Sequence, residues 1–229
     1  MKILAVGAHP DDIEIFMYGF LLVCKKRKDE ISLLIATDGS AGGDKSCTEL
    51  IQTRKKETIK GLQKLGIPDF LNIKDGKMSW DNKHMDILDK YINKKSPDLV
   101  VTHGPEDYHA DHRALSDSVS KIVDFKCPIL FCDTLMGINF TPEIYIDISE
   151  VFKEKQNAIL AHKSQNPKKF LRATKLMNSY RAGQCNAPEG FYAEAYRLYA
   201  KFPYIDIRSI LPPSPKIKPF NIKSEDSLI

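Results

Sequence analysis

The chain has 229 residues, and its composition, 42% hydrophobic and 28% charged, is that of an ordinary globular protein. Its formal net charge of +4 is small and no nucleic-acid-reading module accompanies it, so we expect no nucleic-acid partner. The five Cys residues are widely spaced without a Cys-x-x-Cys pair, and no apolar run is long enough to span a bilayer, so we expect a cytoplasmic protein without an integral membrane segment.

Strand-like and helix-like segments alternate along most of the chain. The expected strands are 2–7, 30–37, 70–73, 98–102, 129–132 and 143–148, and the expected helices are 11–28, 46–65, 86–94, 111–123, 151–162 and 168–181. This rhythm predicts an α/β fold, a mostly parallel sheet with helices on both faces. We expect one domain over residues 1–200, followed by a Pro- and Lys-rich extension over 201–229.

A first group of polar residues comes directly after the first expected strand, in the segment 8–14 (Ala-His-Pro-Asp-Asp-Ile-Glu). Neighbouring residues at a turn point in different directions, so one of the two carboxylates, Asp11 or Asp12, can bind a metal ion while the other faces the water that the ion holds. The alternative is that both merely cap the following helix, where Asp is favoured. His9, immediately before them, favours a site.

A second group follows the strand at 98–102, in the segment 109–112 (His-Ala-Asp-His). His109 and His112 are three residues apart and share one face if the helix has already begun. Asp111 could accept the N–H of a histidine ring and fix its tautomer. His103, at the end of the same strand, is interpreted as a structural residue. Because ligands gather where strands of an open α/β sheet end, the two groups together predict a divalent-metal site, and imidazole with carboxylate suits zinc.

These residues resemble the zinc-dependent N-deacetylases of the PIG-L/LmbE type. The resemblance rests first on the two segments above, where Ala110 replaces the Pro of the family's second motif. Further matches in the same order are 37–39 with Gly42, 54–57, 75–76, 97–103, 145–148, 161–165 and 192–195. It therefore extends to about residue 200 and implies a Rossmann-like α/β domain.

The resemblance implies a ligand set and a base. His9, Asp12 and His112 would be the zinc ligands, with one Zn²⁺ per chain, although another divalent ion stays open. Asp11 would be the general base that deprotonates the metal-bound water.

It also implies roles around the reacting amide. His109 would stabilise or protonate the tetrahedral intermediate, and Asp111 would orient His109. The negative charge of Asp111 would raise the pKa of His109, while the positive charge of zinc would oppose the rise. Arg54 and Asp75 are candidates for gripping sugar hydroxyls or a phosphate, and Glu14 would support the metal-binding loop.

We therefore expect a zinc hydrolase that removes an acetyl group from an N-acetylated amino sugar, such as an N-acetylglucosaminide, joined to another group. Its partner would be a small-molecule or glycoconjugate substrate, and a homo-oligomer stays open. One alternative is a metal-dependent amide or ester hydrolase with a non-sugar substrate. Another is a non-catalytic carbohydrate-binding module, which would have no need of Asp11 as a base.

Overall fold

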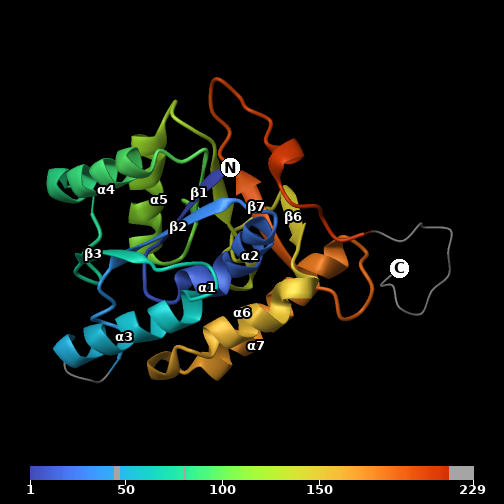
Figure 1. Cartoon of the computed structure of the whole chain (residues 1–229), viewed down its shortest axis with the longest axis horizontal. Coiled ribbons are helices and arrows are strands. Elements are labelled where there is room, and N and C mark those ends of the chain that lie inside the picture. Colours follow the sequence, from blue (N-terminus) through green and yellow to red (C-terminus); the bar gives the residue numbers. More distant parts are fainter. Residues whose placement is uncertain (44–46, 80, 217–229) are drawn as a thin grey trace.

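The computed structural model describes residues 1–43, 47–79 and 81–216, and it is built around one sheet of seven strands (Figure 1). The strands are β1 (Lys2–Gly7), β2 (Glu30–Thr37), β3 (Asp69–Ile73), β4 (Leu99–His103), β5 (Ile129–Cys132), β6 (Ile144–Asp147) and β7 (Ala193–Leu198). Their order across the sheet is β3-β2-β1-β4-β5-β7-β6, and β1 to β5 are mutually parallel while β7 is antiparallel to both its neighbours. The predicted mostly parallel α/β sheet is confirmed.

Helices cover both faces of this sheet, as predicted. They are α1 (Asp12–Phe16), α2 (Tyr18–Lys26), α3 (Cys47–Leu62), α4 (Asn82–Lys95), α5 (Ala110–Val123), α6 (Phe152–Ile159) and α7 (Pro167–Gln184). Side chains alternate along β1, because successive residues of a strand point to opposite faces. Ile3 and Ala5 pack into the core shared with α1, α2, α6 and α7, whereas Leu4 and Val6 pack against α4 and α5. Figure 1 shows the two helical layers on either side of the strands.

One expected helix, 11–28, is in fact two helices that meet at Met17. Met17 has φ −131°, outside the helical range, and α2 begins again at Tyr18. The carboxylate of Glu194 on β7 accepts hydrogen bonds from the backbone N–H groups of Gly19 and Phe20, both at 2.8 Å. A long-range partner therefore holds the free N–H groups at the start of α2, which no local sequence pattern announced.

Ser46, the first residue of the expected helix 46–65, lies outside the described residues, and α3 is described from Cys47. The expected C-terminal extension is described only to residue 216. In that part, Pro213 accepts a hydrogen bond from the backbone N–H of Asp147, so the chain lies along the edge strand β6.

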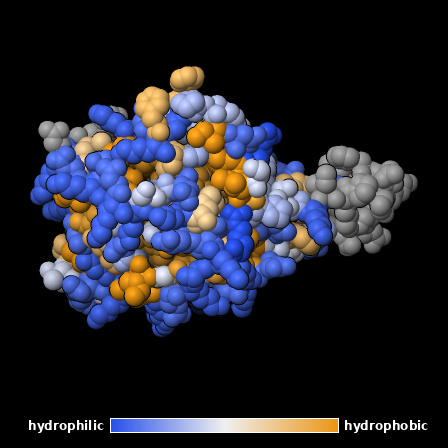
Figure 2. Space-filling model, turned by 45° about the horizontal axis from the view of Figure 1, so that its top comes forward, coloured by the Kyte–Doolittle hydropathy of each residue, from blue (hydrophilic) through white to orange (hydrophobic). Residues whose placement is uncertain are grey.

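The surface is largely hydrophilic on the face shown in Figure 2, where hydrophobic residues are visible mainly between hydrophilic ones. Within the described residues, no helix is long and apolar enough to cross a membrane.

The strand order places the ends of β1 and β4 together. From β1 the chain builds the sheet outward through β2 and β3, and it then returns to place β4 on the other side of β1. Such a change of direction opens a crevice at the carboxyl ends of the two strands, where ligands of open α/β sheets bind. The loops that leave these two ends carry both polar segments identified in the sequence.

Candidate metal centre and active site

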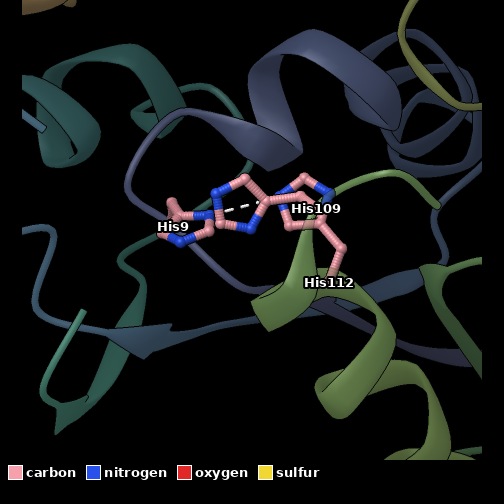
Figure 3. A group of neighbouring side chains, drawn as sticks. All are labelled: His9, His109 and His112. Atoms are coloured by element: carbon pink, nitrogen blue, oxygen red, sulfur yellow. Dashed lines mark hydrogen bonds between the residues drawn. The ribbon is translucent and has the colours of Figure 1, made fainter. Parts of the chain in front are cut away.

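Three side chains converge where the loop after β1 meets the start of α5. His9 Nδ1 lies 3.2 Å from His112 Nε2 and 3.5 Å from Asp12 Oδ2, and His112 Nε2 lies 3.3 Å from Asp12 Oδ2. Figure 3 shows the rings of His9 and His112 facing each other, with His109 beside them. Ligand atoms bound at 2.0–2.1 Å to a tetrahedral ion are about 3.3 Å apart. The donor atoms of these three residues therefore fit a zinc-sized cation.

Other donors lie close to the same point. Among the described residues, three groups have one potential ligand atom per residue within 4.8 Å of the others: His9 with His109 and His112, Asp12 with His103 and His112, and His9 with Asp75 and Asp111. These groups overlap through His9 and His112. The structure thus brings together the predicted ligands and also supplies nitrogen and oxygen donors around them.

In His9 and in His112, the ring nitrogen that points away from the other histidine lies against a carboxylate. His112 Nδ1 lies 2.9 Å from Asp107 Oδ2, while His9 Nε2 lies 3.3 Å from both Asp111 Oδ2 and Asp75 Oδ1. Such contacts fix the tautomer and orientation of a metal-binding imidazole and increase its basicity. They leave His9 Nδ1 and His112 Nε2, the two atoms that face each other, as the available donors.

The partner of Asp111 differs from the expected one. We expected its carboxylate to orient His109, but the carboxylate lies against His9 and accepts the backbone N–H of Gly76 at 2.7 Å. The His109 ring instead accepts the backbone N–H of Asp111, at 3.2 Å from Nδ1. The reason is local: His109 is the N-cap of α5, so its ring closes the first turn while the Asp111 side chain points toward β1.

The carboxylates make the histidines strongly basic in the metal-free protein. Burial opposes the charged form of His9, but hydrogen bonds to Asp111, Asp12 and Asp75 outweigh it and raise the pKa of His9 to about 12. Burial likewise opposes the charged form of His112, and the charge of Asp12 with the hydrogen bond to Asp107 raises its pKa to about 9. A proton is held where a cation would bind, and a metal ion must displace it.

Asp11 is positioned as the neighbour of the ligand set rather than as a helix cap. It has φ 138° and ψ −18°, and its side chain makes no capping hydrogen bond. A non-glycine residue at such a positive φ is strained, and this strain is typical of functional positions. Burial raises the pKa of Asp11 to about 6, with the charge of Arg54 opposing the rise and that of Asp12 adding to it. A carboxylate with that pKa can both accept and release a proton near neutral pH.

Arg54 and Asp75 lie at the site, but both are already engaged. The guanidinium of Arg54 is buried and donates to the backbone oxygens of Gly39 and Pro10, at 3.0 and 2.9 Å, and to Asp11 Oδ2 at 3.2 Å. Asp75 accepts the backbone N–H of Ala41 at 3.1 Å in addition to its contact with His9. We expected both residues to grip the substrate; their observed partners are instead the loops and side chains that shape the site.

His109 is a neutral donor in this arrangement. Burial, followed by the positive charges of His9 and His112, lowers the pKa of His109 below its usual value. The charge of Asp111 does raise the pKa of His109, but burial and the charges of His9 and His112 outweigh it, so the net shift is downward. Since Nδ1 accepts the backbone N–H of Asp111, the neutral ring carries its proton on Nε2.

The site opens into a cavity of about 260 Å³. His9, Asp11 and Asp12 line its floor, and Leu135 and Phe170 line another part of its wall. Ligand pockets for drug-sized molecules are about 300–1,000 Å³. The cavity therefore suits a compact group such as one substituted sugar ring.

Sequence reasoning missed Asp107, the partner of His112. The signal was present, since Asp107 lies in the same loop two residues before His109 and also accepts the backbone N–H of His109 at 2.9 Å. His103, interpreted as structural, is fully buried with Nε2 3.1 Å from Asp12 Oδ2. Glu14 is buried, and its carboxylate lies 2.7 Å from Nε2 of the buried His162, so its support of the metal-binding loop stays a prediction.

The chain belongs to the PIG-L family, described as GlcNAc-PI de-N-acetylase, whose sequence pattern matches residues 4–123, just over half of the chain. It is 27% identical over 185 residues to a probable N-acetyl-α-D-glucosaminyl L-malate deacetylase 2 of Bacillus subtilis, covering 71% of this chain and 82% of the relative. It is 26% identical over 188 residues to diacetylchitobiose deacetylase of Thermococcus kodakarensis, covering 72% and 70% of the two chains. These relatives are deacetylases of N-acetylated sugars.

The fold also occurs with another reaction. The structure superimposes on that of GalB, a 4-carboxy-2-hydroxymuconate hydratase from Pseudomonas putida, with a TM-score of 0.78 and 17% identity, covering 90% of this chain and 98% of the other. At that identity the likeness shows the fold alone. The reaction of this chain must therefore be argued from its site.

Proposed function

We propose that this protein is a zinc-dependent N-deacetylase that removes the acetyl group from an N-acetylated amino sugar joined to another group. The observation that carries the proposal is the triangle of His9, Asp12 and His112 donor atoms with buried, strained Asp11 beside it. The sequence relatives support the substrate class, since both are sugar deacetylases by name.

His9, Asp12 and His112 would hold the ion. Their donor separations suit a tetrahedral cation with three protein ligands, which leaves one position open, as hydrolytic zinc sites do. When bound, zinc polarises a carbonyl oxygen and lowers the pKa of a bound water to about 7.

Asp11 would act as the general base. Its carboxylate lies at the cavity floor and takes a proton from the attacking water, because its raised pKa of about 6 still leaves it ionised at neutral pH. Arg54 holds this carboxylate in place from the opposite side. The same proton can then pass to the departing amine, so that water and the amide become acetate and a free amino sugar.

His109 would stabilise the developing oxyanion. Its Nε2–H, the donor of the neutral ring, would meet the carbonyl oxygen as that atom gains charge. A neutral donor is suited to this role, and burial disfavours a charge on His109.

We also propose a cytoplasmic location. All five Cys residues are free in the structure, and Cys24, Cys127 and Cys132 are buried, as expected for thiols in a reducing compartment.

The test is acetate and amine release from a panel of N-acetylglucosaminides by the zinc-loaded protein, before and after removal of the metal by a chelator. We expect activity that is lost with the metal and restored by zinc. Release from simple amides or esters, with none from any N-acetylated sugar, would overturn the substrate class. Unchanged activity after the chelator has removed the metal would overturn the mechanism.

A further inference from the structure

A second hollow adjoins the mouth of the catalytic cavity. It is a groove of about 460 Å³ between α7 and the 3-10 turn Leu135–Gly137 (η1). Its lining is Met136, Lys168, Lys169, Arg172, Ala173 and Leu176. We call it the α7 groove. Three of these six residues are basic, and the others are apolar.

The α7 groove and the catalytic cavity share their walls. Leu135 and Phe170 line the cavity, whereas the residues next to them in the chain, Met136 and Lys169, line the groove. Consecutive Cα atoms are only 3.8 Å apart, so the two hollows lie next to each other along η1 and along α7. A substrate whose sugar occupies the cavity can continue over this rim into the groove.

The three cations of the groove belong to a positively charged stretch of the chain. Residues 163–175 contain five Lys and Arg residues and no Asp or Glu. Their formal charge of +5 exceeds the net charge of the whole chain, which is +4. Among the ion pairs between described residues, none involves Lys168, Lys169 or Arg172. Their charges are therefore available to a ligand.

The interior of the catalytic cavity has the opposite character. Asp11, Asp12 and Asp75 line it, and Asp107 and Asp111 lie against its histidine rings. These five carboxylates outnumber the positive charges of Arg54, which contacts Asp11 and lies 3.8 Å from Asp75, and of a bound Zn²⁺. An anionic group of a substrate is repelled from this floor unless it binds the metal itself, because like charges at close range destabilise each other. The cations that can pair with such a group lie across the rim.

We propose that the α7 groove binds an anionic aglycone, a short carbon skeleton that carries a carboxylate or a phosphate, while the N-acetylated sugar occupies the cavity. This inference rests on the proposed function and specifies its substrate. Lys168, Lys169 and Arg172 pair with the anion, and the exposed side chains of Met136 and Leu176, 53% and 55% accessible, cover the carbon skeleton.

The test compares N-acetylglucosaminides whose aglycones are carboxyalkyl chains of increasing length, each paired with its uncharged methyl ester, together with the corresponding phosphate. We expect the zinc-loaded wild type to prefer the anionic member of each pair through a lower KM. The double variant Lys169→Ala/Arg172→Ala should lose about five- to tenfold in kcat/KM for anionic substrates and keep its kcat/KM for the esters. The loss should be in KM rather than kcat, because these residues lie away from the reacting amide.

Lys175→Ala is the matched control, since Lys175 is an exposed cation of the same helix that does not line the groove. Equal kcat/KM for charged and esterified substrates, or a preference that survives in the double variant, would overturn the inference while the deacetylase proposal stands. Wild type that sediments with anionic phospholipid vesicles but does not discriminate between the soluble substrates would reassign the groove to a lipid surface. Failure of the proposed function would look different, with no acetate released from any member of the panel.

Discussion

The catalytic cavity and the polar cluster around Glu194 both bury carboxylates, but they balance the negative charge in different ways. Glu194 accepts the backbone N–H groups of Gly19 and Phe20, the hydroxyl of Tyr196 at 2.7 Å and the ammonium of Lys155 at 2.6 Å. One carboxylate meets one cation, and both of its oxygens are hydrogen-bonded. Such a satisfied network stabilises the start of α2 and needs nothing from outside.

The catalytic cavity leaves its balance incomplete. Asp11, Asp12 and Asp75 face it, and Asp111 and Asp107 lie against its histidine rings. In the metal-free protein three cations lie among these five carboxylates, namely Arg54, His9 and His112. The pKa of Asp11 is raised, and its backbone is strained. Comparing the clusters teaches that burial of charge alone does not mark a functional site. An excess of carboxylates around a cavity, beside a strained backbone, does.

The largest expected effect is on turnover. Asp11→Asn cannot accept the proton of water, so kcat should fall by about 10²- to 10⁴-fold while the metal is retained. Acetate release with parallel zinc analysis measures both. The control is Asp117→Asn on α5, outside the residues that line the cavity, which should leave kcat unchanged. Retention of most turnover in Asp11→Asn would exclude Asp11 as the base.

The Glu194 cluster should respond in stability instead. Glu194→Gln leaves the ammonium of Lys155 fully buried without its counter-charge, which typically lowers the free energy of unfolding by about 3–5 kcal/mol. Urea denaturation of the metal-free protein provides the measurement. A change below about 1 kcal/mol would show that this network is not the stabilising counterpart of the cavity.

Removing the charge of Asp11 should stabilise the protein, whereas removing the charge of Glu194 should destabilise it. Because the pKa of Asp11 is raised from 3.8 to about 6, its contribution to stability is fully present below pH 3.8 and is lost as pH rises through about 6. At pH 7 the metal-free Asp11→Asn variant buries one carboxylate fewer, while Asp75 stays near the buried Arg54 as a counter-charge. It should be more stable than wild type by at most about 3 kcal/mol, at 1.36 kcal/mol per pKa unit. The gain should disappear at pH 4. An Asp11→Asn variant that is less stable than wild type at pH 7 would contradict an excess of negative charge around the catalytic cavity.

Asp107 should affect metal affinity more modestly. Its carboxylate orients His112 without reaching the ion position, and loss of such a partner typically weakens metal binding about 10- to 100-fold. Zinc competition with a chromogenic chelator measures the affinity of Asp107→Asn, and Asp117→Asn again serves as the control. Unchanged affinity would show that His112 does not need this partner.

The smallest expected effect is the release of protons when zinc binds. The raised pKa values of His9 and His112 mean that zinc binding at pH 7 must release at least one proton from the histidines. Titration calorimetry in buffers of different ionisation enthalpy measures the release, and apparent zinc affinity should increase with pH. Binding without proton release would show that the two rings are neutral before the metal arrives.

The sequence predicted the parallel sheet and the two polar segments because both depend on local order along the chain. The apolar runs at β1 and β4 fix the strands, and His9, Asp12 and His112 follow at their ends, where a parallel sheet brings them together.

What escaped prediction depends on directions in space. Which imidazole the Asp111 carboxylate faces follows from the rotation of α5 after its N-cap, and spacing alone cannot give it. The inward direction of the Arg54 guanidinium depends on the backbone oxygens of two loops. The break at Met17 depends on Glu194, far along the chain.

The division of labour between the two adjacent carboxylates is the central claim, and zinc content tests it most directly. After zinc loading and removal of free metal, wild type and Asp11→Asn should each carry about one zinc per chain, whereas Asp12→Ala should carry almost none, because three protein ligands are the usual minimum for a hydrolytic zinc site. Zinc retained by Asp12→Ala and lost from Asp11→Asn would contradict the account and exchange the roles of the two residues.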